Sequence, residues 1–109
     1  MIVKNCEKPL IISECGGYTL KIENHVWNPK AKYGYGSSNN KQELTQKIAQ
    51  MYKKMIIPAI KHGLCGCVYT QLSDVEDEIN GFYTYDRKVC KVEKEAMQEI
   101  AEEIKKALN

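Results

Sequence analysis

Two short apolar segments, separated by one helical pattern, restrict the fold of this chain more than any other feature of its sequence. The first segment is Pro9–Ile12, and it closes at Glu14 before two glycines. The second is Leu64–Leu72, which is rich in strand-forming residues. A continuous apolar run of this length is typical of a strand buried on both faces, as in a parallel sheet. We therefore predict strands over residues 9–14 and 64–72.

The segment between these strands has the pattern of a helix over residues 40–62. Asn40 can cap it, and Glu43 follows three residues later, as in a capping box. Pro58 should kink or end this helix, and Gly63 should stop it. Its apolar residues recur at helical spacing: Leu44, Ile48, Met51, Tyr52 and Met55.

A second helix is predicted over residues 92–108, where Met97, Ile100, Ile104 and Leu108 share one face. The order of elements makes two βα units, and crossovers of helix length require parallel strands with a right-handed connection. A length of 109 residues sets a single small domain over 1–109. We therefore expect an α/β fold whose function gathers at the carboxyl ends of the strands.

Charge and hydropathy patterning limit the classes of partner. Lys and Arg number 16 against 14 Asp and Glu, and a formal net charge of +2 does not indicate a nucleic-acid partner. The apolar runs are far shorter than the roughly 20 residues of a membrane helix. No apolar stretch of a signal peptide follows Met1. We therefore expect a cytoplasmic chain with no nucleic-acid or membrane partner.

The five cysteines leave two interpretations. An odd number without a secretory signal argues against a disulfide framework. Cys65 and Cys67 lack the two-residue spacer of common zinc knuckles, and His25 and His62 are not spaced as finger ligands. A zinc site is one interpretation, and reduced thiols packed as small hydrophobes are the other. We adopt the second, and expect neither a metal nor a cofactor.

Glu14 is the first candidate for chemistry. It ends an apolar strand, and Gly16 and Gly17 allow backbone to approach closely. At the rim of a sheet, burial and neighbouring groups can tune the pKa of a carboxyl group. The alternative is a strand-end glutamate that caps a loop amide or lies in solvent. A long polar and aromatic loop over residues 18–40 follows, and loops of this length are usually functional or disordered.

The stretch Ile12–Gly17 resembles the seventh-strand nucleophile motif of glycoside hydrolase family 2. The resemblance covers the chain from Pro9 into the last helix. An ordered series of this kind is more specific than any single motif. The further segments that carry it are Tyr33–Gly36, Met55–Ile60, Gly63–Cys65, Val68–Glu76 and Asn80–Lys88.

This resemblance implies the C-terminal part of a (β/α)8 TIM barrel, namely its last two βα units. Family members are retaining exo-glycosidases that act on β-linked sugars, such as β-galactosidases, β-glucuronidases and β-mannosidases, with β-sandwich domains before the barrel. Glu14 would then be the catalytic nucleophile. Tyr69 would match the eighth-strand aromatic residue of the sugar platform, and Tyr18 and Trp27 would line the same substrate site.

The sequence departs from the family at two places. The acid/base glutamate of the family lies in an Asn-Glu pair, which this sequence does not contain. An acidic residue of segment 74–78 could face Glu14 instead, or these residues are loop carboxylates at the substrate rim. In addition, Glu78-Ile79-Asn80 stands where the β-glucuronidases carry an Asn-x-Lys, so we do not expect glucuronide specificity.

A whole barrel typically needs ~250 residues. We therefore expect a fragment that is inactive alone and belongs to a parent enzyme with a carbohydrate substrate. The alternative is a catalytically silent carbohydrate-binding or interaction module derived from the barrel. Unpaired strand edges are a template for association, so we expect the isolated chain to form a homo-oligomer.

Overall fold

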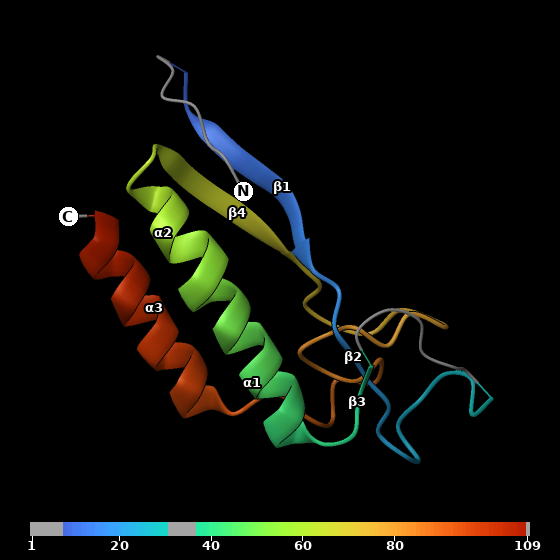
Figure 1. The fold of residues 1–109 in the computed structure, drawn as a ribbon. Coiled ribbons are helices and arrows are strands. Elements are labelled where there is room, and N and C mark those ends of the chain that lie inside the picture. The colour runs from blue at the N-terminus through green and yellow to red at the C-terminus, as the bar shows by residue number, and fades with distance from the viewer. Residues whose placement is uncertain (1–7, 31–36, 109) are drawn as a thin grey trace.

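Two parallel strands with helices on one side of them form the body of the molecule (Figure 1). The computed structural model describes residues 8–30 and 37–108. The mixed α/β class with parallel strands is thus confirmed. In chain order the elements are β1 (Leu10–Gly16), β2 (Thr19–Leu20), β3 (Ser37–Ser38), α1 (Lys41–Met51), the π-helical segment η1 (Tyr52–Ile56), α2 (Ile57–Ile60), β4 (Leu64–Thr70) and α3 (Lys94–Leu108).

The two long strands, β1 and β4, pair with each other in parallel. The helical segment between them supplies the crossover that a parallel pair requires. The two short strands, β2 and β3, form a second parallel pair. Within the described part of the chain, β1 and β4 have no other strand partner, so each keeps one open edge.

One face of the β1–β4 pair is covered and the other is open. Leu10 and Ile12 pack against the core formed with α2 and Leu64. On the opposite face, Ile11 is 60% exposed and Val68 is 57% exposed. The expectation that both strands are buried on both faces is therefore wrong for this structure, because the helices lie on one side only (Figure 1).

Helix α1 begins as its sequence predicts. The Asn40 side chain accepts a hydrogen bond of 2.8 Å from the Glu43 backbone N–H, which satisfies one of the free donors of the first turn. The Glu43 carboxylate does not complete the reciprocal capping box, since it accepts from Asn39 Nδ2 at 3.3 Å. Leu44 and Ile48, one turn apart, enter the core.

Pro58 acts on the helix one turn before its own position. Its ring clashes with the carbonyl four residues back in a regular α-helix, and it lacks an N–H. The chain widens into the π-helical η1 immediately before it, and the Ile57 N–H bonds to Tyr52 O five residues back. The helix then continues to Ile60, so the proline changes its winding but does not end it.

Helix α3 begins at Lys94, two residues later than the predicted start at 92. Val92 instead fills the core beside α1. The Glu93 backbone N–H donates to Thr45 Oγ1 at 2.9 Å. This bond ties the start of α3 to α1, and it explains why the apolar residue at 92 belongs to the connecting loop.

Two loops pack together at the carboxyl ends of β1 and β4 (Figure 1). We call them the loop layer, defined as residues 17–30 and 71–92. The Leu20 N–H donates to Ile79 O at 3.0 Å, which joins one loop to the other. Strand β4 ends at Thr70 rather than at 72. Tyr33–Gly36 of the family resemblance lies outside the described residues, as does Cys6.

Candidate functional site

Glu14 lies in a β-bulge near the carboxyl end of β1. Between the pairs Ile12↔Cys67 and Cys15↔Tyr69, β1 advances three residues while β4 advances two. The extra residue disrupts the alternation of the strand, so that Ser13 and Glu14 are both exposed in succession. Bulges of this kind re-aim a side chain and are frequent next to active sites.

The Glu14 carboxylate is accessible. Within the described residues, no hydrogen bond or ion pair engages it. Beyond it the chain continues the ladder through Gly17, whose N–H donates to Thr70 O at 3.0 Å. The arrangement holds the backbone around Glu14 in place while the carboxylate stays open to a ligand.

Tyr69 lies against the core and is partly buried. It stacks on Phe82 with ring centroids 4.4 Å apart and an interplanar angle of 21°. Its hydroxyl is buried without a hydrogen-bond partner, and burial raises the pKa of this phenol well above its usual range. In this structure the ring therefore packs against the core, with Phe82 stacked on it.

Gly16 is the position where this packing tolerates no side chain. Its φ is +95°, and a Cβ there would lie 2.4 Å from Tyr69 Cε2. Gly17 has a similar φ of +79°, but a Cβ there would meet nothing within 4 Å. A side chain at Gly16 would therefore suffer both backbone strain and a clash with the Tyr69 ring, whereas one at Gly17 would suffer backbone strain alone.

We expect Gly16→Ala to lower the free energy of unfolding by about 2–4 kcal/mol, since strain at positive φ and overpacking add. Gly17→Ala is the matched control and should lose only the strain, about 1–2 kcal/mol. Urea unfolding followed by circular dichroism measures both. If both variants lose the same free energy of unfolding, the contact with Tyr69 does not contribute to the cost of the Gly16 substitution.

The other two predicted substrate residues lie in different surroundings. Tyr18 is half-buried and packs against two clusters of core residues, one that includes Leu44 and one that includes Leu64. Trp27 is exposed, with its ring edge-to-face against Tyr85 at a centroid distance of 6.2 Å. The structure thus keeps Glu14 and Trp27 accessible, and turns Tyr18 and Tyr69 toward the core.

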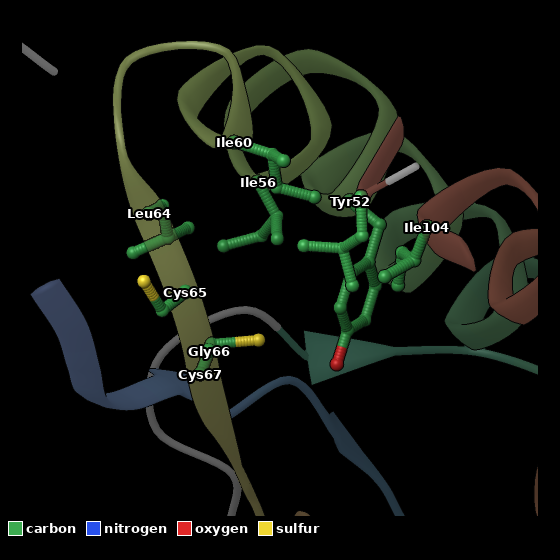
Figure 2. A pocket seen from close by; sticks show the side chains of 9 residues that line it. Tyr52, Ile56, Ile60, Leu64, Cys65, Gly66, Cys67 and Ile104 are labelled. Carbon is green, nitrogen blue, oxygen red and sulfur yellow. The ribbon is translucent and has the colours of Figure 1, made fainter. Parts of the chain in front are cut away.

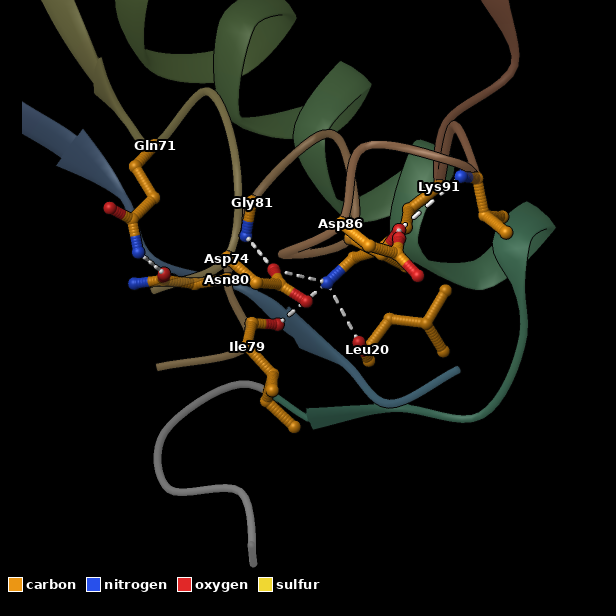
Figure 3. Close-up of polar contacts among 10 residues, drawn as sticks. Leu20, Gln71, Asp74, Ile79, Asn80, Gly81, Asp86 and Lys91 are labelled. Carbon is orange, nitrogen blue, oxygen red and sulfur yellow. Dashed lines mark hydrogen bonds and ion pairs between the residues drawn. The ribbon is translucent and has the colours of Figure 1, made fainter. Parts of the chain in front are cut away.

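A buried ion pair, which the sequence analysis missed, holds the loop layer together. Lys91 is fully buried, and its Nζ donates to Asp74 Oδ1 at 2.8 Å (Figure 3). The same ammonium donates to Leu20 O at 2.8 Å and to Ile79 O at 2.9 Å. Its three donors are therefore all used, and they join three separate stretches of the loop layer.

The environment of this pair opposes charge on both partners. Burial raises the pKa of Asp74 and lowers the pKa of Lys91, while their mutual contact counteracts both shifts. Gly81 N–H also donates to Asp74 Oδ1 at 2.8 Å, but Asp74 Oδ2 is buried without a partner. No sequence pattern distinguishes Lys91 from an exposed lysine in a loop.

The acidic segment 74–78 does not present its first carboxylate to Glu14. Asp74 is committed to the buried pair with Lys91. Asp77 accepts a hydrogen bond from Asn28 Nδ2 at 3.1 Å, on the exposed side of the loop layer. In this structure Asp74 and Asp77 therefore tie neighbouring loops together.

The cysteines with described positions are all free: Cys15, Cys65, Cys67 and Cys90. Burial and the neighbouring Cys67 raise the pKa of the Cys15 thiol to about 11, so it is protonated at neutral pH. It donates weakly to Val68 O at 3.5 Å. Across residues 8–30 and 37–108, no group of three or more His, Cys, Asp or Glu side chains is arranged to hold a metal ion.

A cavity of about 280 Å³ lies between β4 and the helices (Figure 2). Figure 2 shows the hydroxyl of Tyr52 and the thiols of Cys65 and Cys67 among its lining side chains. Burial raises the pKa of the Tyr52 phenol, so this group is uncharged at neutral pH. The remaining wall is largely apolar. Its lining residues are Tyr52, Ile56, Ile60, Leu64, Cys65, Gly66, Cys67, Ile104 and Leu108.

Among the helices that the structure describes, none is long and apolar enough to cross a bilayer. In comparisons with known proteins, no protein-family model matches this chain and no curated protein sequence matches it significantly. The structure itself establishes a small α/β unit with an exposed glutamate at a bulge near the carboxyl end of a parallel strand.

Proposed function

We propose that this chain is the C-terminal part of the catalytic TIM barrel of a retaining β-glycosidase that resembles glycoside hydrolase family 2. Glu14 is its nucleophile. The observation that carries the proposal is the bulge in β1, which leaves the Glu14 carboxylate exposed near the carboxyl end of a parallel strand. In α/β barrels this end of the strands is where catalytic residues lie.

The open face of the strand pair also supports the proposal. In a closed barrel, the inward side chains of each strand pack against those of other strands. Ile11 and Val68 project from the face that no described helix covers. Six further βα units in the parent protein would cover this face and take up both open strand edges.

Retention of anomeric configuration needs two carboxyl groups about 5–5.5 Å apart. Glu14 attacks the anomeric carbon and forms a glycosyl ester, while the second group donates its proton to the departing oxygen. The second group then takes a proton from water, which attacks the same carbon and frees Glu14. Asp74 is paired with Lys91, and the sequence holds no Asn-Glu pair of the family's acid/base type. We therefore assign the second carboxyl group to another part of the parent enzyme.

Covalent trapping in the parent protein tests the proposal. The whole reading frame that contains this chain is treated with 2-deoxy-2-fluoro-β-glycosides that carry a dinitrophenolate leaving group. We expect one glycosyl label, on the peptide that contains Glu14, and no label in Glu14→Gln. Glu99→Gln, an exposed carboxylate on α3, is the matched control and should label normally.

The isolated chain of 109 residues should hydrolyse no nitrophenyl glycoside, because the preorganised groups around the sugar are incomplete. A label on a residue other than Glu14 in the parent protein would remove the nucleophile assignment. Turnover by the isolated chain, lost in Glu14→Gln, would contradict the fragment assignment.

A further inference from the structure

Two exposed aromatic side chains meet in the loop layer, one from each of its loops. Trp27 is 61% exposed and Tyr85 is 41% exposed. Their rings meet edge-to-face, with centroids 6.2 Å apart and an interplanar angle of 79°. They form an open corner with aromatic surface on two sides. Contiguous exposed apolar surface rimmed by polar groups, unlike single scattered apolar side chains, is a mark of a binding site.

Polar contacts on both sides of Trp27 hold this corner in place. His25 Nδ1 lies 2.8 Å from Asp86 Oδ2, next to Tyr85. Asn28 Nδ2 donates to Asp77 Oδ1 at 3.1 Å. The residues before and after Trp27 are thus each tied to the opposite loop. A ligand that binds here meets rings that are already positioned, and it loses little free energy in ordering them.

Asp86 is the firmest of these anchors. Its Oδ1 accepts from the Thr84 hydroxyl at 2.5 Å and from the Lys88 N–H at 3.0 Å. The Thr84 hydroxyl first, and then His25, hold the pKa of the Asp86 carboxyl well below its usual range. An ionised acceptor therefore lies directly beside Tyr85 at neutral pH.

We propose that the Trp27–Tyr85 corner binds a pyranose ring of a β-linked oligosaccharide. One face of a pyranose carries C–H groups and packs on an aromatic ring, while hydroxyl groups at its rim need donors and acceptors. His25, Asn28 and Asp77 supply such groups next to the rings. This charged surround disfavours a protein partner, because the cores of protein interfaces are depleted of charge.

The choice of a saccharide rests on the proposed function, whereas the geometry of the corner does not involve Glu14. The site would hold sugar units of the substrate or of a related chain in the loop layer. In this proposal Tyr85 is a further sugar-binding residue, and the rings of Trp27 and Tyr85 together contact the pyranose.

Trp27 is the only tryptophan, so its fluorescence reports directly on this corner. The full chain is titrated with cellotetraose, β-1,4-mannotetraose and β-1,4-galactotetraose. We expect a saturable change in Trp27 emission with at least one of them. Tyr85→Ala should weaken that Kd by about tenfold, the scale of one lost aromatic contact. Leu72→Ala, an exposed apolar side chain on the same loop layer, is the matched control and should bind normally.

Trp27→Ala is measured by calorimetry, since it removes the fluorophore, and it should show no binding heat. Circular dichroism verifies that each variant is folded. Failure of all three tetrasaccharides, an equal response to glycerol, or an unchanged Kd in Tyr85→Ala would overturn the site. If a tetrasaccharide binds but Glu14 takes no covalent label, only the hydrolase proposal fails. If Glu14 is labelled but no tetrasaccharide binds at the corner, only the Trp27–Tyr85 sugar site fails.

Discussion

Replacing Lys91 with methionine is expected to destabilise the chain by about 3–5 kcal/mol, the scale for breaking a buried ion pair by removing one partner. Methionine fills much of the same space but donates no hydrogen bond. It leaves the Asp74 carboxylate buried without its counter-ion, and it removes the donor from Leu20 O and Ile79 O. Domains are typically stable by only about 5–15 kcal/mol, so the loss is a large part of the whole.

Urea unfolding followed by circular dichroism measures this loss. Lys88→Met is the matched control, because the Lys88 side chain is exposed, and it should change stability by less than about 0.5 kcal/mol. Asp74→Asn in the Lys91→Met background removes the stranded charge and should recover part of the loss. If Lys91→Met were as stable as Lys88→Met, the ion pair would not be what holds the loop layer.

The sequence predicts well what local pattern determines. The Asn40 cap, the parallel pairing of β1 with β4 and the general place of α3 all follow from residue periodicity and from the order of elements. The same patterns fail where contacts between distant residues decide the outcome. Val92 fits the apolar stripe of α3, yet the bond from Glu93 N–H to Thr45 holds it in the loop.

The candidate site shows the same division. Glu14 is marked by its place after an apolar strand, but the bulge that exposes it is a matter of register with β4. One sign of the bulge is the spacing of Ile12 and Cys15. They are three residues apart and both face the core, whereas residues on one face of a regular strand are an even number apart. Tyr69 could not be placed, since its face depends on Phe82 in a distant loop. The local sequence does not identify Lys91, because its burial depends on the packing of loops that are distant in the sequence.

Self-association of the isolated chain is the second large effect that we expect. The outer edges of β1 and β4 have no partner strand in the described residues, and unpaired edges favour pairing with another chain. Parallel sheets are ordinarily covered on both faces. Here the helices lie on one side of the strand pair (Figure 1). On the other face, Ile11 and Val68 are exposed to solvent. Sedimentation velocity should therefore show a dimer or larger species at micromolar concentration.

A charge on the open face should reverse this association. Val68→Lys places an ammonium where the second copy would pack, and burying it unpaired is strongly unfavourable. Met55→Lys is the matched control, because Met55 is exposed on η1, away from the strand pair, and it should associate like the parent chain. Since two strands alone are at best marginally stable, association and strand protection should also rise together. A monomer at all concentrations, with hydrogen-exchange protection along both outer edges, would mean that the chain covers its own edges, and the barrel-fragment proposal would then lose its structural support.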